Sequence, residues 1–144
     1  MASFRDIALD APVYVNFIIP ENAGAVDSAI FTSDGYYELL EAREVHTTAG
    51  SDGSAVTLDV VKAASGTAFG SGTSMLASTF NLKATAATPV SKTITNGGIS
   101  ATRSSRLIQT GDTIYVNFAG TLTAYVGGVL TLALKRYRNA PRVR

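Results

Sequence analysis

TIYVNFAGTLTAYVGGVLTLAL, residues 113–134, is the stretch that decides the fold. It carries no charged side chain over 22 positions, which is also long enough for a membrane-spanning helix. Every second position is apolar in two runs: Ile114, Val116 and Phe118, then Leu130, Leu132 and Leu134. A period of two is typical of β-strands, and a lipid-facing helix has no reason to show it. The stretch therefore predicts two core strands joined as a β-hairpin.

Further strand patterns follow one another at short spacing toward the N-terminus. We expect strands at residues 13–19, 29–32, 36–47, 55–63, 79–84, 90–95 and 99–108, with a loop at 64–74 and a helical turn at 75–78. Turn signals such as Asp34-Gly35 and the NGG at 96–98 separate them. About eight or nine short strands without a long helical period predict an all-β fold, either a β-sandwich or a jelly-roll-like barrel.

Residues 36–47 are the least certain of these segments, because ELLEAREV contains good helix formers. Two observations favour a strand. Turn-forming residues precede and follow the segment, as in a hairpin. Tyr37, Leu39 and Val45 also share one parity, so we expect these three side chains to face the core.

The composition agrees with a single β-rich domain over residues 1–144. Thr occurs 17 times, Ser 13 times and Gly 13 times, while charged residues make up only 16%. We expect a mobile N-terminal segment at about 1–10, without a secretory signal, and a basic C-terminal arm at about 137–144. The absence of cysteine excludes thiolate chemistry and cysteine-based zinc sites.

The charges are divided unevenly along the chain, although the net charge is only +1. Residues 1–59 contain ten acidic side chains and two basic ones, whereas residues 60–144 contain ten basic side chains and one acid, Asp112. Two interpretations remain open. Strands from the two halves pair and neutralise each other within one fold, or patches of opposite sign dock on neighbouring subunits.

The residue types that catalysis needs are scarce. His46 is the only histidine, and since no G-x-S-x-G accompanies it we expect it at the surface. Glu38, Glu41 and Glu44 offer the two carboxylates of a glycosidase, but their alternation favours solvated side chains. The glycine-rich loop at residues 66–72 lacks the lysine of a phosphate-binding loop. No acidic cluster has calcium-loop spacing. We predict no catalytic residue, no cofactor and no metal site.

The strongest local feature is the basic C-terminal sequence KRYRNAPRVR, residues 135–144. Arginines interleaved with a tyrosine suit a phosphate backbone, but arginine also pairs with carboxylates at protein interfaces. Since the net charge is small, we favour an arm that binds protein and expect no nucleic-acid or membrane partner. The expected interface residues are Arg136, Tyr137, Arg138, Arg142 and Arg144.

Three stretches have a distinctive pattern: VHTTAGSDGSAVTLDVVKA (45–63), GTSMLASTFNLKATA (72–86) and LIQTGDTIYVNFAGTLTAYVGGVLTLALKR (107–136). They resemble small head-decoration (cement) or virion structural proteins of tailed bacteriophages. Within them a turn-flanked strand is followed by L-x-S-T-F-x-L, then by a G-D segment with alternating apolar residues, then by G-T-L-T-A. These motifs specify a β-scaffold and carry no chemistry.

The resemblance implies a non-enzymatic virion protein, a capsid decoration protein that binds and stabilises the head shell. Its expected partners are the major capsid protein and further copies of itself, as a homotrimer. Its expected location is the capsid exterior, after synthesis in the host cytoplasm. The alternative is a head-fibre or tail component with a carbohydrate- or receptor-binding sandwich, using tyrosines as stacking surfaces: Tyr14, Tyr36, Tyr37, Tyr115 and Tyr125.

Overall fold

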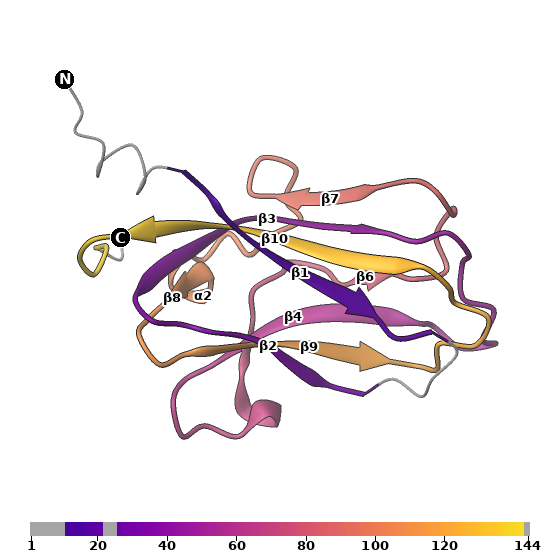
Figure 1. Cartoon of the computed structure of the whole chain (residues 1–144), viewed down its shortest axis with the longest axis horizontal. Helices are drawn as coiled ribbons and strands as arrows, with labels where there is room; N and C mark the ends of the chain where they lie inside the picture. Colours follow the sequence, from indigo (N-terminus) through magenta and orange to yellow (C-terminus); the bar gives the residue numbers. More distant parts are fainter. Residues whose placement is uncertain (1–10, 22–25, 143–144) are drawn as a thin grey trace.

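Two antiparallel β-sheets packed face to face make up the fold (Figure 1). The computed structural model describes residues 11–21 and 26–142, so the N-terminal segment expected to be mobile lies outside the described residues. In the first sheet the order is β1-β10-β3-β7, and β8 also pairs with β3. In the second the order is β2-β9-β4-β5, and β6 also pairs with β4. The predicted all-β sandwich or jelly-roll-like fold is confirmed.

The strands vary widely in length. The first sheet contains β1 (Val13–Ile19), β3 (Tyr36–Val45), β7 (Val90–Thr93), β8 (Leu107–Ile108) and β10 (Gly128–Tyr137). The second contains β2 (Ser28–Thr32), β4 (Thr57–Ala63), β5 (Thr73–Ser74), β6 (Phe80–Asn81) and β9 (Thr113–Ala119). A 3₁₀ turn, η1 (Phe69–Ser71), and one helical turn, α2 (Arg103–Arg106), complete the described elements.

The core lies between the two sheets and follows the period-two patterns of the sequence. Leu130, Leu132 and Leu134 on β10 are fully buried, and they face Ile114 and Val116 of the other sheet within one cluster. Val56, just before β4, and Leu58 and Val60 on β4 are also fully buried. Burial of each such side chain contributes about 1.5–3 kcal/mol, so these three strands carry much of the stability.

The predicted hairpin of residues 113–134 is wrong, although both of its strands exist. β9 pairs with β2 and β4, whereas β10 pairs with β1 and β3, so the two strands belong to different sheets. The connection at 120–127 crosses from one sheet to the other. Gly120 opens it with a φ of 78°, where an added Cβ would lie 2.3 Å from the carbonyl oxygen of Ala55. The apolar rows therefore face each other across the core and are not side by side.

A β-bulge in β3 changes which side chains face the core. Leu134 pairs with Leu39 and Ala133 pairs with Glu41, so Leu40 has no partner in the ladder. Before this extra residue the odd positions point inward, and after it the even positions do, because a bulge shifts the alternation by one. Tyr37 and Leu39 are buried as predicted, but Val45 points outward and Glu44 takes the inner position.

Two further local expectations are wrong. Residues 75–78 form no helical turn, because Leu76 instead makes an isolated β-bridge to Ile99. The strand expected at 99–108 is reduced to β8, preceded by the helical turn α2. In both segments backbone pairing is limited to short stretches, the bridge at Leu76 and the two residues of β8 that pair with β3.

Asp52 links the loop at 50–56 by hydrogen bonds to the connection at 120–127 between the sheets. Its Oδ2 accepts hydrogen bonds from the Thr121 backbone N–H (3.1 Å), the Thr121 hydroxyl (2.7 Å) and the Ser54 hydroxyl (2.9 Å). These bonds hold the pKa of the Asp52 carboxyl well below its usual range, because they favour the ionised form. The bonds therefore stabilise the folded chain above the unfolded pKa, about 3.9, and the stabilisation is lost as the pH falls further.

We accordingly expect Asp52→Ala to be less stable than the native chain at pH 7, with the difference shrinking as the pH is lowered from about 5 to 2. Urea unfolding at a series of pH values measures this. Asp59→Asn is the control with the opposite sign, because burial raises the pKa of Asp59. A stability difference for Asp52→Ala that does not depend on pH would show that its carboxylate is not held by these bonds.

Candidate interaction surface

The outer face of the first sheet exposes large apolar side chains. On the edge strand β1, Tyr14 is 63% exposed and Ile18 is 75% exposed. The register places Ile18 beside Val129, and Val129 beside Val45, in one apolar row across three strands. We call the outward side chains of β1, β10 and β3 the open face: Tyr14, Asn16, Ile18, Val129, Thr131, Ala133, Glu41, Arg43 and Val45.

A polar row crosses the middle of the open face. Asn16 accepts a hydrogen bond from the hydroxyl of Thr131 (2.8 Å), which pairs in turn with Arg43. Arg43 forms an ion pair with Glu41 (2.7 Å), and Glu41 also accepts a hydrogen bond from Ser91. A shallow hollow of about 60 Å³ lies between Tyr14 and this row. The face thus combines apolar area with oriented polar groups, as protein-binding surfaces do.

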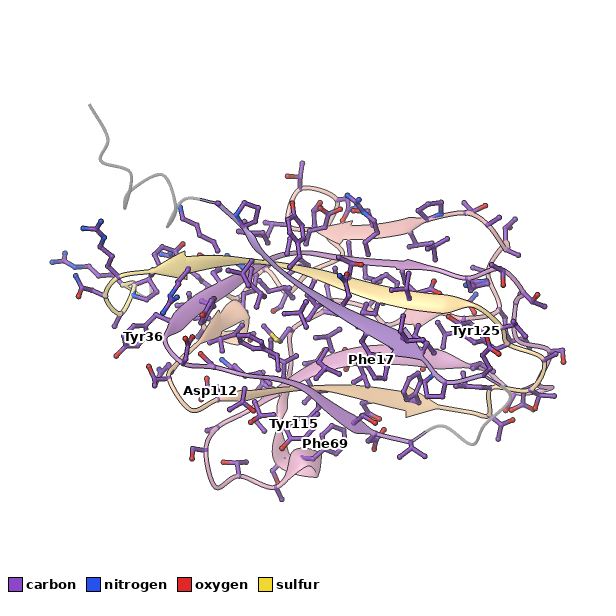
Figure 2. All side chains as sticks on the ribbon, viewed as in Figure 1. Phe17, Tyr36, Phe69, Asp112, Tyr115 and Tyr125 are labelled. Atoms are coloured by element: carbon purple, nitrogen blue, oxygen red, sulfur yellow. The ribbon has the colours of Figure 1, made fainter. Side chains whose placement is uncertain are left out.

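The second sheet is covered on its outer face at one end. The loop between β4 and β5 places Phe69 against Tyr115, with ring centroids 5.0 Å apart (Figure 2). Within the strands of the described residues, two large apolar side chains are more than half exposed. They are Tyr14 and Ile18, and both lie on β1 in the open face. The open face is therefore the better docking surface of the two.

Glu38 anchors a charged cluster at the end of the sandwich where β10 finishes. Its carboxylate accepts hydrogen bonds from Arg106 (3.2 Å), Arg103 (3.3 Å) and the Tyr137 hydroxyl (2.5 Å). The Glu38 and Arg106 side chains are only 7% and 8% exposed. Burial by itself raises the pKa of Glu38, but the three donors outweigh it and leave the pKa below its usual range. The cluster is a buried ion pair.

A second buried cluster contains Glu44, His46 and Tyr125. Glu44 Oε1 lies 2.8 Å from His46 Nδ1 and accepts a hydrogen bond of 2.8 Å from the Tyr125 hydroxyl. His46 Nε2 lies 3.0 Å from the carbonyl oxygen of Ala84, so both ring nitrogens face oxygen acceptors. All three side chains are 1% exposed or less. Burial raises the pKa of the Tyr125 hydroxyl, as does its bond to Glu44.

These clusters correct two sequence-based expectations. His46 is buried and not at the surface, and Glu38 and Glu44 are buried and not solvated; only Glu41 is partly exposed. The bulge sends Glu38 outward and Glu44 inward, about 20 Å apart along the strand, so the structure does not bring the glutamates together as an acid–base pair. Both were buried by partners distant in sequence, Arg106 and Tyr125, which no local pattern could reveal.

The predicted interface residues divide between strand and tail. Arg136 and Tyr137 belong to β10: Arg136 pairs with Asp34 (3.5 Å) and lies over the ring of Tyr37, and Tyr137 binds Glu38. Arg138 and Arg142 are exposed, and the backbone carbonyl of Arg142 accepts a hydrogen bond from Arg103 (2.8 Å). Arg144 lies outside the described residues.

The tyrosines considered for sugar stacking do not form one surface. Tyr37 is 4% exposed and Tyr125 is fully buried. Tyr115 packs against Phe69, and Tyr36 lies at the end of the sandwich where β10 finishes (Figure 2). Both are half-buried, whereas Tyr14 is exposed on the open face, so the three lie on different parts of the molecule.

Three observations complete the survey of the described residues. Three ion pairs join the acidic first half to the basic second half, Arg103–Glu38, Arg106–Glu38 and Arg136–Asp34. No group of three histidine, aspartate or glutamate side chains in the described ranges is arranged to hold a metal ion. No helix within them is long and apolar enough to cross a membrane.

Comparison with solved structures shows a likeness of fold. The chain is similar to a chain of the capsid of Ralstonia phage GP4, with a TM-score of 0.55 and 15% sequence identity, over 89% of this chain and 86% of that chain. It also aligns with 35% of a chain of infectious bursal disease virus, Gx strain, at 13% identity over 94% of this chain. That TM-score, 0.35, is too low to indicate a common fold. No family model and no curated protein matches. What this chain shares with the phage capsid chain is the fold, along nearly the whole length of both.

Proposed function

We propose that the chain is a non-enzymatic structural protein of a virus particle and that it decorates the capsid shell from outside. The observation that carries the proposal is the likeness of fold to the Ralstonia phage GP4 capsid chain, because it spans both chains almost completely. The sequence resemblance to phage head-decoration proteins points the same way from independent evidence. On this proposal the partners are the major capsid protein and further copies of the chain, in a homotrimer.

The buried clusters support a structural role. Glu38, Glu44 and His46 carry the chemistry that a catalyst would use, but each is committed to internal hydrogen bonds with its side chain turned away from solvent. They fix the two ends of β3 within the sandwich. Tyr14 and Ile18 on the open face, by contrast, are exposed and remain available to a partner.

We propose that the open face is the surface that contacts the shell. Ile18 is the most exposed large apolar side chain in the described residues and sits on a rigid strand between Val129 and the free edge of β1. Burial of one such side chain contributes about 1.5–3 kcal/mol, which corresponds to roughly tenfold or more in affinity. Tyr14 adds an aromatic ring of the kind enriched at interface hot spots.

The test uses the virus whose genome encodes the chain. Particles grown without the gene are expected to lack an outer density in cryo-electron microscopy, and purified protein added back should restore it. Ile18→Asp should weaken this binding about tenfold or more, because a buried unpaired carboxylate replaces an apolar contact. Ile94→Asp is the matched control, since Ile94 is 45% exposed but lies off the open face.

Two results would contradict the proposal at different levels. If neither the protein made during infection nor the purified protein added back co-sediments with particles, a virion role is ruled out. Binding that Ile18→Asp and Ile94→Asp reduce equally would keep the virion role but remove the open face as the contact surface.

A further inference from the structure

Charge is sorted along the long axis of the sandwich, although the two halves of the sequence interleave. The end where β10 finishes also carries α2 and the turn between β2 and β3 (Figure 1). Among the described residues there, seven side chains are basic and three are acidic, Asp34, Glu38 and Asp112. The acids Asp34 and Glu38 are matched by the arginines that bind them. The other basic side chains at this end, which we call the basic end, are Lys62, Lys135, Arg138 and Arg142.

The opposite end, where β10 begins, carries the complementary charge. Its carboxylates are those of Glu21, Asp27, Glu44 and Asp52, and Lys83 is its one lysine or arginine among the described residues. Glu21 and Asp27 are exposed, and each accepts a hydrogen bond from a backbone N–H, of Gly127 and Phe118 respectively. A neutral donor fixes a carboxylate without cancelling its charge, so this acidic end keeps a negative field.

The basic end also has a recess. A hollow of about 390 Å³ lies between the turn at Gly35 and the end of β10, and it is lined by Tyr36, Arg136 and Arg138 among others. Arg136 is paired there with Asp34 across 3.5 Å, and the Asp34 side chain is 69% exposed. Two guanidinium groups around a solvent-filled hollow favour a carboxylate-bearing loop as the occupant, because arginine pairs with carboxylates through two parallel hydrogen bonds.

We infer that the basic end of one copy of this chain binds the acidic end of a second copy, head to tail. A second copy is favoured over other acidic partners because the molecule itself displays both complementary surfaces. A contact between two different patches is heterologous, and repeating it closes a ring or extends a chain. The inference deepens the proposed function, since it names the contact between copies in the homotrimer, but it is tested without the capsid.

Sedimentation of the purified chain at about 10 mM and about 150 mM salt measures the contact, because screening shortens the reach of exposed charges between these conditions. We expect self-association at low salt that weakens as salt rises. Arg138→Glu with Arg142→Glu should raise the Kd for self-association about tenfold or more, and Glu21→Arg with Asp27→Arg should do the same.

Mixing the two reversed variants is the decisive experiment. Each alone has two ends of like charge, but the reversed basic end of one matches the reversed acidic end of the other, so the mixture should associate again. If a double variant does not fold, a mixture of the Arg142→Glu variant and the Glu21→Arg variant gives the same comparison with one substitution in each chain. Arg43→Glu makes the same charge change in the middle of the open face and leaves both ends intact, so it is the control for net charge and should self-associate as the native chain does.

Three results would overturn the inference. The first is a monomer at low salt and high micromolar concentration. The second is self-association that reversal of either end leaves unchanged, which would point to the open face or a free strand edge. The third is self-association of Arg43→Glu that falls as far as that of the end variants, which would show that net charge alone governs the attraction. None of these depends on whether the chain binds a capsid.

Discussion

Glu38→Ala is expected to lower the free energy of unfolding by about 3–5 kcal/mol, because removal of one partner leaves the buried charge of the other uncompensated. Arg106 would then have a guanidinium that is 8% exposed, with only the carbonyl oxygens of Ser100 and Ala101 as acceptors. Its Nε already has no partner among the described residues. The loss should lower the thermal midpoint by about 10 °C in a chain of this size.

Glu41→Ala is the matched control for Glu38→Ala on the same strand. The Glu41 and Arg43 side chains are 27% and 56% exposed, and an exposed pair of this kind contributes about 0–1 kcal/mol. Urea unfolding of both variants, with the slope checked for two-state behaviour, gives the comparison. A loss of less than about 1 kcal/mol for Glu38→Ala would mean that solvent reaches Arg106 and that the cluster is not a buried ion pair.

His46→Ala should cost a similar amount, about 3–5 kcal/mol, at the other end of the molecule. The substitution leaves the fully buried Glu44 carboxylate with the Tyr125 hydroxyl as its one described partner and also creates a cavity. Tyr125→Phe removes only the hydroxyl and should cost about 1.5–3 kcal/mol, the usual contribution of a hydrogen bond to a charged group.

A triple variant tests whether charge or packing causes the loss. Glu44→Leu, His46→Leu and Tyr125→Phe together replace the cluster with apolar groups of similar size, and replacing both partners of a buried hydrogen bond in this way can be nearly neutral or stabilising. We expect the triple variant to recover at least half of the free energy of unfolding that His46→Ala loses. A triple variant that is no more stable than His46→Ala would show that the hydrogen bonds of the cluster themselves stabilise the fold.

The strands of the sandwich could be predicted because their side chains alternate locally. The inward sets on β9 and β10 were read correctly from a period of two, and the bounds of β1 were predicted to the residue. The pairing of β9 with β10 could not be read in this way, because alternation shows which face is buried but not which strand lies beside it. An eight-residue connection serves a hairpin and a crossing between sheets equally well.

The buried polar clusters could not be predicted from the sequence, for a related reason. A glutamate or histidine in a strand has the same local pattern whether it faces water or a distant partner. At Glu44 the bulge at Leu40 added a second obstacle, because it reversed the parity on which the inward set of β3 was predicted. The open face was not predicted either, since the exposure of Tyr14 and Ile18 depends on β10 lying beside β1, 115 residues apart at Asn16 and Thr131.

The central position of β10 in the first sheet has a consequence for how the chain folds during its synthesis. β1 pairs with β10, and β3 pairs with β10 along most of its length, so the sheet cannot assemble until residues 128–137 have emerged from the ribosome. β1 and β3 are therefore without their main partner until β10 has been synthesised. Pairings this distant fold slowly, and unpaired apolar strands are prone to aggregation while they wait. The emergence of β10, and not of any earlier segment, is therefore the event that permits the first sheet to fold.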